Sequence, residues 1–403
     1  MNQYLRGALL TVLCLATAAA TVHATGTREL ASDEEAVEVG PENAAVTLIE
    51  NGRRIEEVAR YATGFQAYRN GRFTIIEVTR PWQGAGPADA LRYVLYPRED
   101  SAPEVSGADL VLGVPVESIV TMSTTFLPHL AAIDAKDSLA AVDSVAYAYS
   151  EWVHERHRAN GLIQVGSGPN VDVEQLLVLD PDVVMVNSYG GDWDAQPVLE
   201  EAGLPVVVSG DWVEHAPLGR AEWLLFTSMF FGELESALEV FNEIEQEYLR
   251  LAALASEAME TPTVLSNAPY QGTWSVPGGE SYAARFIADA SGDYVWSDTE
   301  TTGAIHLDVE TVYAEAGDAD VWINPGAWTS LEAGAAEDER FASFKAFRTG
   351  RVYSNNLRTG RGGGNDYFES GALNPHIILN DLIWVLHRDL VPDYEPFYYQ
   401  RLQ

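Results

Sequence analysis

The residues in this sequence whose type and spacing could support metal chemistry are two histidines three positions apart, His154 and His157. Side chains at i and i+3 share one face of a helix, so the two imidazoles could bind one ion together. No third ligand is evident beside them in the sequence. His129, His215 and His306 fall in loops or at helix starts and could converge through the fold. The alternative interpretation of each histidine is a structural residue whose ring nitrogens bond to the protein itself.

Covalent catalysis has little support in the sequence. The chain contains no Gly-x-Ser-x-Gly nucleophile elbow, and its one cysteine, Cys14, lies in an apolar N-terminal run. The 60 acidic residues are so numerous that spacing alone cannot nominate a pair of catalytic carboxylates. The glycine triplet 362–364 lacks the Gly-Lys-Ser/Thr ending of a phosphate-binding loop. We therefore expect no catalytic residues, no cofactor and no resident metal.

The charge balance restricts the possible partners. The 60 acidic residues against 24 Lys and Arg give a formal net charge of −36. Such a chain repels nucleic acid and anionic membrane surfaces, so neither is expected as a partner. This charge suits a soluble, exported protein and opposes self-association, so we expect a monomer. It would equally suit a saline habitat.

Regular elements must position the chemically interesting residues, and residues 163–208 contain the plainest ones. Residues 173–179 show helical spacing, Pro181 ends that helix, and the apolar run 183–186 predicts a strand buried on both faces. The turn-rich segment 188–193 follows at the carboxyl end of that strand. Open α/β sheets bind ligands at such ends, so this loop is a candidate part of a binding site.

The same order of residues recurs downstream. Asp308-Val309-Glu310 followed by 320–323 repeats Asp172-Val173-Glu174 followed by 182–185. The repeat predicts two similar α/β lobes. Because a helix followed by a strand is common in α/β chains, coincidence is the alternative.

Two further segments show clear patterns. An amphipathic helix of about 24 residues begins at Leu234 and ends before Pro262, and at 1.5 Å per residue it would be about 36 Å long. Upstream, 73–78 and 91–96 predict two strands, which the turn-rich segment 81–87 joins into a hairpin.

The N-terminus predicts export. Arg6 precedes the apolar run 8–20, which is too short to span a bilayer, and Val22-His23-Ala24 ends in small residues suited to signal-peptidase cleavage. The residues before Cys14 make a poor lipoprotein box, because the bulky Leu13 stands where a small residue is expected. We therefore expect a free periplasmic protein and not a lipid-anchored one.

The order of several motifs resembles that of the periplasmic solute-binding proteins of ABC importers for ferric siderophores, haem and vitamin B12. The motifs that carry the resemblance are 116–120, 166–186, 202–207 and Gly278-Gly279-Glu280-Ser281. The resemblance implies an α/β fold, with two Rossmann-like lobes joined by one long backbone helix and a ligand cleft between the lobes. It divides the chain into a signal peptide at 1–24, an acidic leader and N-terminal β-hairpin at 25–106, an N-terminal α/β lobe at 107–232, a linking backbone helix at 233–261 and a C-terminal α/β lobe at 262–403.

A large ring-bearing ligand buries mainly apolar surface and needs a few polar groups for orientation. The candidate ligand-binding residues are therefore aromatic and hydroxyl side chains near the expected cleft, with two arginines that could pair with a negative charge on the ligand. They are Ser123, Thr124, Tyr147, Tyr149, Tyr189, Trp212, Arg220, Tyr270, Trp274, Trp328 and Arg361. The alternative for the two hydroxyl residues is capping of the next helix, and for each aromatic residue a place in the core.

The resemblance also implies one exposed acid at the top of each lobe, which docks to arginines of the membrane permease. Glu280 matches the second-lobe position, and Asp194, or Asp192, falls at the first-lobe position, where Glu is expected. The expected function is capture of an iron-siderophore, haem or cobalamin-like ligand and its delivery to an ABC permease in the inner membrane. The alternatives are a binding protein for bare Zn or Mn ions, or an exported enzyme or sensor on the same scaffold.

Overall fold

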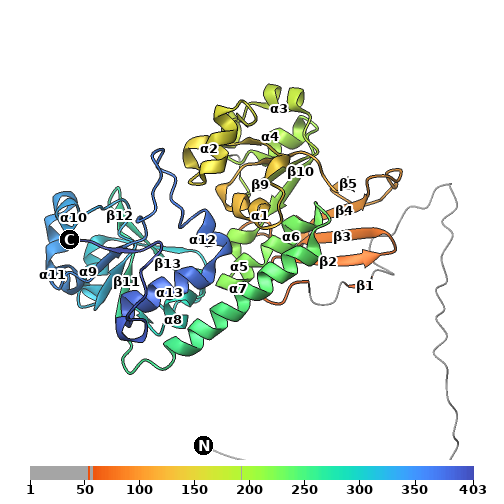
Figure 1. Ribbon diagram of the computed structural model, residues 1–403. Helices are drawn as coiled ribbons and strands as arrows, with labels where there is room; N and C mark the ends of the chain where they lie inside the picture. Colours follow the sequence, from red (N-terminus) through yellow and green to blue (C-terminus); the bar gives the residue numbers. More distant parts are fainter. Residues whose placement is uncertain (1–52, 55–57, 192) are drawn as a thin grey trace, which may run out of the picture. The chain divides into compact units, whose positions relative to one another are not determined.

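The computed structural model describes residues 53–54, 58–191 and 193–403 (Figure 1). The predicted signal peptide at 1–24 with Cys14, most of the acidic leader, and Asp192 lie outside the described residues. Within these ranges the strands form four sheets, three of which have five strands each. No helix in the same ranges is long and apolar enough to cross a membrane.

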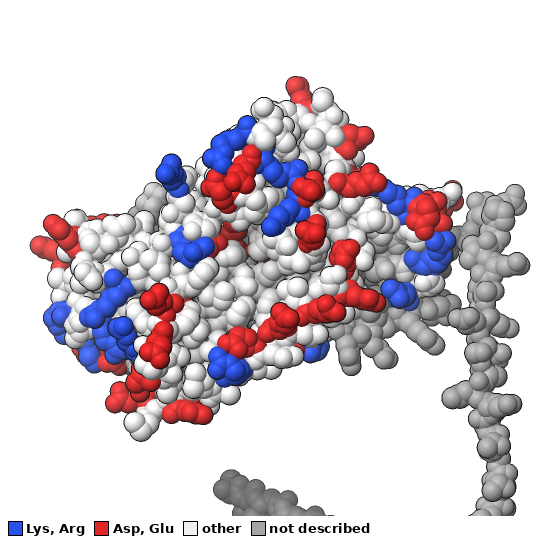
Figure 2. Space-filling view, in the orientation of Figure 1, with Lys and Arg blue, Asp and Glu red and all other residues white. Residues whose placement is uncertain are grey.

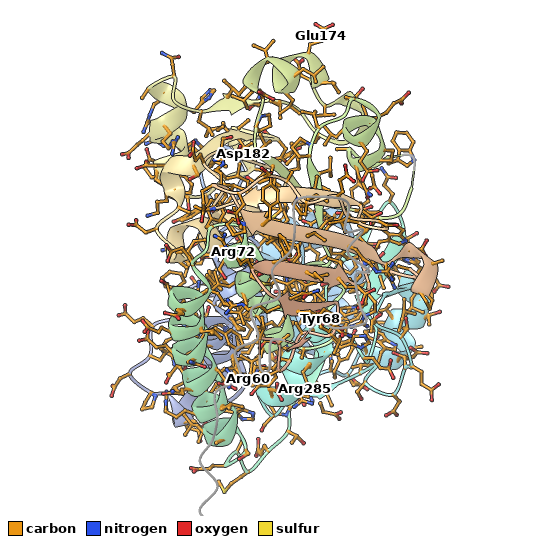
Figure 3. The ribbon with its side chains drawn as sticks, turned by 90° about the vertical axis from the view of Figure 1, so that its right-hand side faces the viewer. Arg60, Tyr68, Arg72, Glu174, Asp182 and Arg285 are labelled. Carbon is orange, nitrogen blue, oxygen red and sulfur yellow. The ribbon has the colours of Figure 1, made fainter. Side chains whose placement is uncertain are left out.

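An N-terminal sheet precedes the two lobes and faces the viewer in Figure 3. In the described part of the chain its strands lie in the order β1 (Arg53–Arg54), β2 (Phe65–Asn70), β3 (Phe73–Val78), β4 (Leu91–Pro97) and β5 (Leu110–Val114). β3 and β4 pair antiparallel with Ile75 opposite Val94, so the predicted hairpin is confirmed. β5 pairs parallel to β4 and extends the sheet beyond the expected boundary at residue 106.

The first lobe is built on a parallel sheet in the order β10, β9, β6, β7 and β8. These strands are β6 (Ile119–Thr121), β7 (Leu139–Val142), β8 (Ile163–Gln164), β9 (Val183–Asn187) and β10 (Val206–Ser209). The helices are α1 (Leu127–Ala132), α2 (Glu151–Arg158), α3 (Val173–Leu179), α4 (Gln196–Glu201), α5 (Pro217–Ala221) and α6 (Trp223–Met229). Residues 183–186 are all buried, which confirms the prediction of a strand covered on both faces.

The second lobe has a sheet in the order β14, β11, β16, β17 and β18, in which only the edge strand β18 is antiparallel. These strands are β11 (Thr263–Ser266), β14 (Asp293–Tyr294), β16 (Val321–Ile323), β17 (Val352–Ser354) and β18 (Gln400–Arg401). A smaller sheet contains β12 (Pro269–Tyr270), β13 (Thr273–Pro277) and β15 (Ala304–Leu307). The helices are α8 (Tyr282–Asp289), α9 (Val309–Ala316), α10 (Leu331–Glu337), α11 (Lys345–Arg348), α12 (Ser370–Leu373) and α13 (Pro375–Leu386).

The long helix α7 (Leu234–Ala255) joins the two lobes (Figure 1). It has 22 residues and is about 33 Å long at 1.5 Å per residue. It packs against α6 of the first lobe and α13 of the second, so the predicted bridge is confirmed. Its opposite face exposes Glu235, Glu239 and Glu243 at spacings of four, and Figure 2 shows the resulting acidic row along the helix.

Each lobe contains the same reciprocal pair of hydrogen bonds between an Asp and a hydroxyl residue. In the first lobe the Ser118 N–H donates to Asp182 Oδ2 at 3.0 Å, and the Asp182 N–H donates to Ser118 Oγ at 2.9 Å. In the second lobe the Thr263 N–H donates to Asp320 Oδ2 at 3.0 Å, and the Asp320 N–H donates to Thr263 Oγ1 at 2.9 Å. The downstream repeat in the sequence is therefore a structural repeat and not a coincidence.

Candidate functional site

A pair of aromatic side chains, one exposed and one half-buried, lies just beyond the carboxyl ends of β9 and β10. Tyr189 and Trp212 follow these two strands, and their ring centroids are 5.0 Å apart. Tyr189 is 71% exposed. The indole N–H of Trp212 is buried and has no hydrogen-bond partner among the described residues. The pair therefore offers apolar ring surface at the edge where α/β sheets bind ligands.

Asp194 shapes the loop that carries Tyr189. Its Oδ2 accepts hydrogen bonds from Ser188 Oγ at 2.8 Å and from the N–H groups of Tyr189 and Gly190 at 2.9 and 2.8 Å. Asp194 is only 4% exposed, and a buried carboxylate persists because such bonds satisfy its oxygens. This position does not fit the exposed docking acid expected there: Asp194 holds the loop in place.

A polar network links the same strand ends to the second lobe. Asp211, which follows β10, accepts bonds from Asn187 Nδ2 at 2.7 Å and from Arg220 Nε at 3.3 Å. The Arg220 guanidinium also lies 5.0 Å from the ring centroid of Tyr282 in the second lobe. Because Arg220 is already paired and its side chain is 14% exposed, it holds the lobes together more than it offers charge to a ligand.

The loop that follows β17 makes a contact between the lobes that we call the interlobe latch. Glu369 accepts hydrogen bonds from the N–H groups of Tyr149 at 2.6 Å and Ser150 at 3.0 Å, at the start of α2. Gly362 packs so closely on Ala146 that a Cβ at Gly362 would lie 2.7 Å from the Ala146 carbonyl oxygen. A carboxylate of the second lobe thus supplies acceptors for a helix start in the first.

Three predicted site residues lie in or beside the interlobe latch. The Arg358 guanidinium lies 4.9 Å from the ring centroid of Tyr149, so Tyr149 is part of the latch. Tyr147 is 57% exposed, and Arg361 is exposed in the glycine-rich loop. Tyr147 and Arg361 are therefore accessible to a ligand.

The hydroxyl residues after β6 serve the local backbone. Ser123 is the N-cap of a short 3₁₀ turn, and its Oγ accepts the N–H of Thr125 at 3.4 Å. The capping interpretation therefore holds for Ser123. Thr124 is half-buried in the same turn.

The histidines do not converge. His154 and His157 bond to separate carbonyl oxygens, those of Ala148 at 2.9 Å and Leu162 at 3.0 Å. Burial lowers the pKa of His129 to about 4, so its ring is neutral at neutral pH. The ring of His215 forms a hydrogen bond with Arg80, and that of His306 with Ser275. In residues 53–54, 58–191 and 193–403, no three His, Cys, Asp or Glu side chains are grouped so that they could hold a metal ion.

Two predicted ligand residues belong to the core of the second lobe instead. Trp274 is 0% and Trp328 is 2% exposed. Their ring centroids lie 5.4 and 5.0 Å from that of Trp322 on β16. Tyr270, on the neighbouring strand of the same hairpin, is 77% exposed. Aromatic side chains in one hairpin thus face opposite environments, which the sequence alone did not resolve.

Glu280 is exposed, as expected for a second-lobe docking acid. It lies between β13 and α8, at a groove of about 650 Å³ that residues of α7 and α8 also line, among them Tyr248 and Arg285.

Sequence reasoning missed three residues near the predicted site. Trp82 lies against the loop that carries Tyr189. The sequence signal for it was its position as an aromatic residue in a segment rich in Gly and Pro. Asp211 and Glu369 gave no signal, because the sequence of a chain with a net charge of −36 does not distinguish a buried acidic residue from the many exposed ones.

Comparisons with known proteins extend these observations. A protein-family model described as a periplasmic binding protein matches residues 119–356. Two uncharacterized lipoproteins of Methanocaldococcus jannaschii are 27% and 28% identical to this chain over 317 and 318 residues. Each alignment covers 74% of this chain, and they cover 73% and 76% of the two relatives.

Solved structures show the same fold. The TroA-like periplasmic binding protein FepB from Veillonella parvula matches with a TM-score of 0.53 and 16% identity, over 72% of this chain and 96% of that chain. A periplasmic heme binding protein from Pseudomonas aeruginosa matches with a TM-score of 0.51 and 18% identity, over 72% of this chain and 98% of that chain.

Proposed function

Because the chain belongs to the periplasmic binding protein family, we propose that it is the substrate-binding component of an ABC importer. It captures a ring-bearing ligand of the iron-siderophore, haem or cobalamin type outside the cytoplasm and delivers it to the permease. It carries out no reaction on that ligand.

The Tyr189–Trp212 pair is the observation that carries this proposal. Ring-bearing ligands bury mainly apolar surface, and two adjacent aromatic rings at a sheet edge provide such a surface. Tyr147 and Arg361 are also exposed and offer a further ring and a positive charge.

The ligand class can be tested by calorimetric and absorbance titration of the purified protein with haemin, cyanocobalamin and a ferric siderophore. We expect one of the three to bind with 1:1 stoichiometry. Replacing Trp212 by Ala should weaken that binding at least tenfold, a change of about 1.4 kcal/mol. Stoichiometric binding of Zn²⁺ or Mn²⁺, lost in a His154→Ala and His157→Ala double variant, would instead favour the metal-binding alternative.

We also propose that Glu280 docks to the permease. Exposed ion pairs contribute about 0–1 kcal/mol each, so docking would require several such contacts. A Glu280→Ala variant should bind ligand normally but stimulate transport less in reconstituted vesicles. Unchanged transport would assign docking to other residues.

The form of the mature protein is part of the same proposal. We propose signal cleavage after Ala24 and a free periplasmic protein, in which the N-terminal sheet ends with β5 at Val114 and is followed by the first lobe up to residue 232, the linking helix at 233–261 and the second lobe at 262–403. The two similar proteins of Methanocaldococcus jannaschii are named lipoproteins, so a lipid anchor at Cys14 is the alternative. The intact mass of the exported protein distinguishes the two.

A further inference from the structure

The loop between β3 and β4 lies against the first lobe beside the aromatic pair. This loop belongs to the N-terminal sheet and lies outside residues 119–356, which the family model matches. The indole of Trp82 takes up the space that a side chain at Gly190 would need, since a Cβ there would lie 2.6 Å from Trp82 Cδ1 and Nε1. Gly190 directly follows Tyr189, so the indole lies against the backbone of the loop that carries one ring of the pair.

The same loop also contacts the segment that carries the other ring. Gly210, two residues before Trp212, packs directly against the carbonyl oxygen of Arg80. The Arg80 side chain continues along this segment, where its Nη1 lies 2.6 Å from His215 Nε2. Trp82 is therefore held where the loops after β9 and β10 meet.

On its other side the loop reaches the second lobe. The side-chain amide of Gln83 fills the position that a side chain would take at Gly303, the residue before β15. Gln83 directly follows Trp82 in the chain. Of these two consecutive loop residues, Trp82 thus contacts the first lobe and Gln83 the second.

Hydrogen bonds hold the backbone of this loop. The Thr79 N–H donates to the Gly64 carbonyl at 2.8 Å, and the Gly86 N–H donates to Asp89 Oδ2 at 2.7 Å. Trp82 itself remains half-exposed. The loop backbone is therefore held in place before any ligand arrives, which reduces the entropy that binding would cost.

We propose that the β3–β4 loop forms part of the ligand site, with Trp82 as a third ring beside Tyr189 and Trp212 and with Gln83 positioning the loop on the second lobe. This inference rests on the proposed function and specifies its ligand class. Flat aromatic faces stack best on a flat conjugated ring system. The three rings therefore favour a planar tetrapyrrole over a rounded, polar ferric chelate.

Absorbance titration of the exported full-length protein with haemin tests the proposal. We expect Trp82→Ala to weaken haemin binding at least tenfold, because stacking on one aromatic ring contributes about 1 kcal/mol beyond its buried area. Gly303→Ala displaces only the flexible amide of Gln83 and should weaken binding about threefold. Trp193→Ala removes a neighbouring indole that is 82% exposed and serves as the matched control, with no change expected. Thermal unfolding of each variant verifies that it folds.

The possible failures are distinguishable. If haemin binds the wild type and the Trp82→Ala variant equally, the role of the loop is overturned and the proposed function stands. If the wild type binds cyanocobalamin or a ferric siderophore but not haemin, the preference for a planar porphyrin is overturned and importer function stands. If none of the three ligands binds, both proposals fail.

Discussion

Asp182 and Asp320 hold equivalent positions in the two lobes. Each precedes the strand that lies beside the first strand of its lobe's sheet, and each exchanges two hydrogen bonds with a hydroxyl residue at or just before that first strand. A cation approaches the other carboxylate oxygen in both lobes: Arg98 at Asp182, and Lys345 at 2.6 Å from Asp320. The same set of hydrogen bonds and one ion pair therefore fixes the register of neighbouring strands in both lobes.

Removing the Asp182 carboxylate should destabilise the protein. Asp182→Ala leaves the N–H groups of Glu117 and Ser118 without their acceptor, at a cost of roughly 2–3 kcal/mol in the free energy of unfolding. Urea denaturation measures the loss. Glu174→Ala is the matched control, because Glu174 is an exposed acid of the same lobe that extends into solvent in Figure 3, and it should change stability by less than about 0.5 kcal/mol. Equal losses for the two variants would contradict the role of Asp182.

The interlobe latch should also contribute to stability. Glu369→Ala removes both acceptors at the start of α2 and should cost roughly 2–4 kcal/mol, because each unsatisfied buried N–H costs about 1–3 kcal/mol before water compensates. Hydrogen exchange of the Tyr149 and Ser150 amides should accelerate in the variant. Exchange rates that match those of the wild type would show that Glu369 does not hold the latch closed.

Stability should depend on the protonation of Asp143, which follows β7 and is buried. Burial raises the pKa of Asp143 to about 6 from 3.8, so the folded state binds this proton more tightly than the unfolded chain. Stability from this group is present below about pH 4 and is lost as the pH rises through 6, by roughly 3 kcal/mol. Asp143→Asn should therefore stabilise the protein at pH 8 and have no such effect at pH 4, as measured by denaturation at both pH values.

Asp172 serves as the control for this measurement, because its contribution to stability should depend on pH in the opposite direction. The N–H of Gln175 lowers the pKa of Asp172, the exposed N-cap of α3, so its contribution is present at neutral pH and is lost on acidification. Asp172→Asn should therefore destabilise the protein at neutral pH and lose that effect in acid. A stability difference between wild type and Asp143→Asn that does not change with pH would refute the assignment.

Trp274 should be a structural residue and Tyr270 should not. Trp274→Ala removes a fully buried indole and should lower the free energy of unfolding by roughly 3–5 kcal/mol. Tyr270→Ala, in the same hairpin but 77% exposed, should change it by less than about 0.5 kcal/mol. Guanidinium denaturation of both variants decides this prediction. A small loss for Trp274→Ala would return that residue to the list of candidate ligand contacts.

Local patterns predicted much of the fold. The helical spacing after Asp172, the stop at Pro181 and the amphipathic run from Leu234 are properties of neighbouring residues, and α3, β9 and α7 follow them closely. The parallel pairing of β5 with β4 was not predicted, because it depends on a contact across a connection that has no local signal.

The candidate site was less predictable because it depends on which way side chains face. Tyr189 and Trp274 are both aromatic residues near strand ends, yet one is 71% exposed and the other fully buried. Asp194 and Glu280 looked alike as loop acids, and only the fold shows that Asp194 bonds to its own loop. Trp82 reaches the first lobe from another sheet, and an aromatic residue in a segment rich in Gly and Pro was its one sequence signal.

Glu369 makes the start of an α-helix in one lobe depend on the other lobe. Moving the lobes apart would remove the acceptor of two main-chain donors at once, which opposes separation of the lobes. Under the proposed function, unloading would then fall to the membrane machinery that grips both lobes, and little cargo would escape in transit.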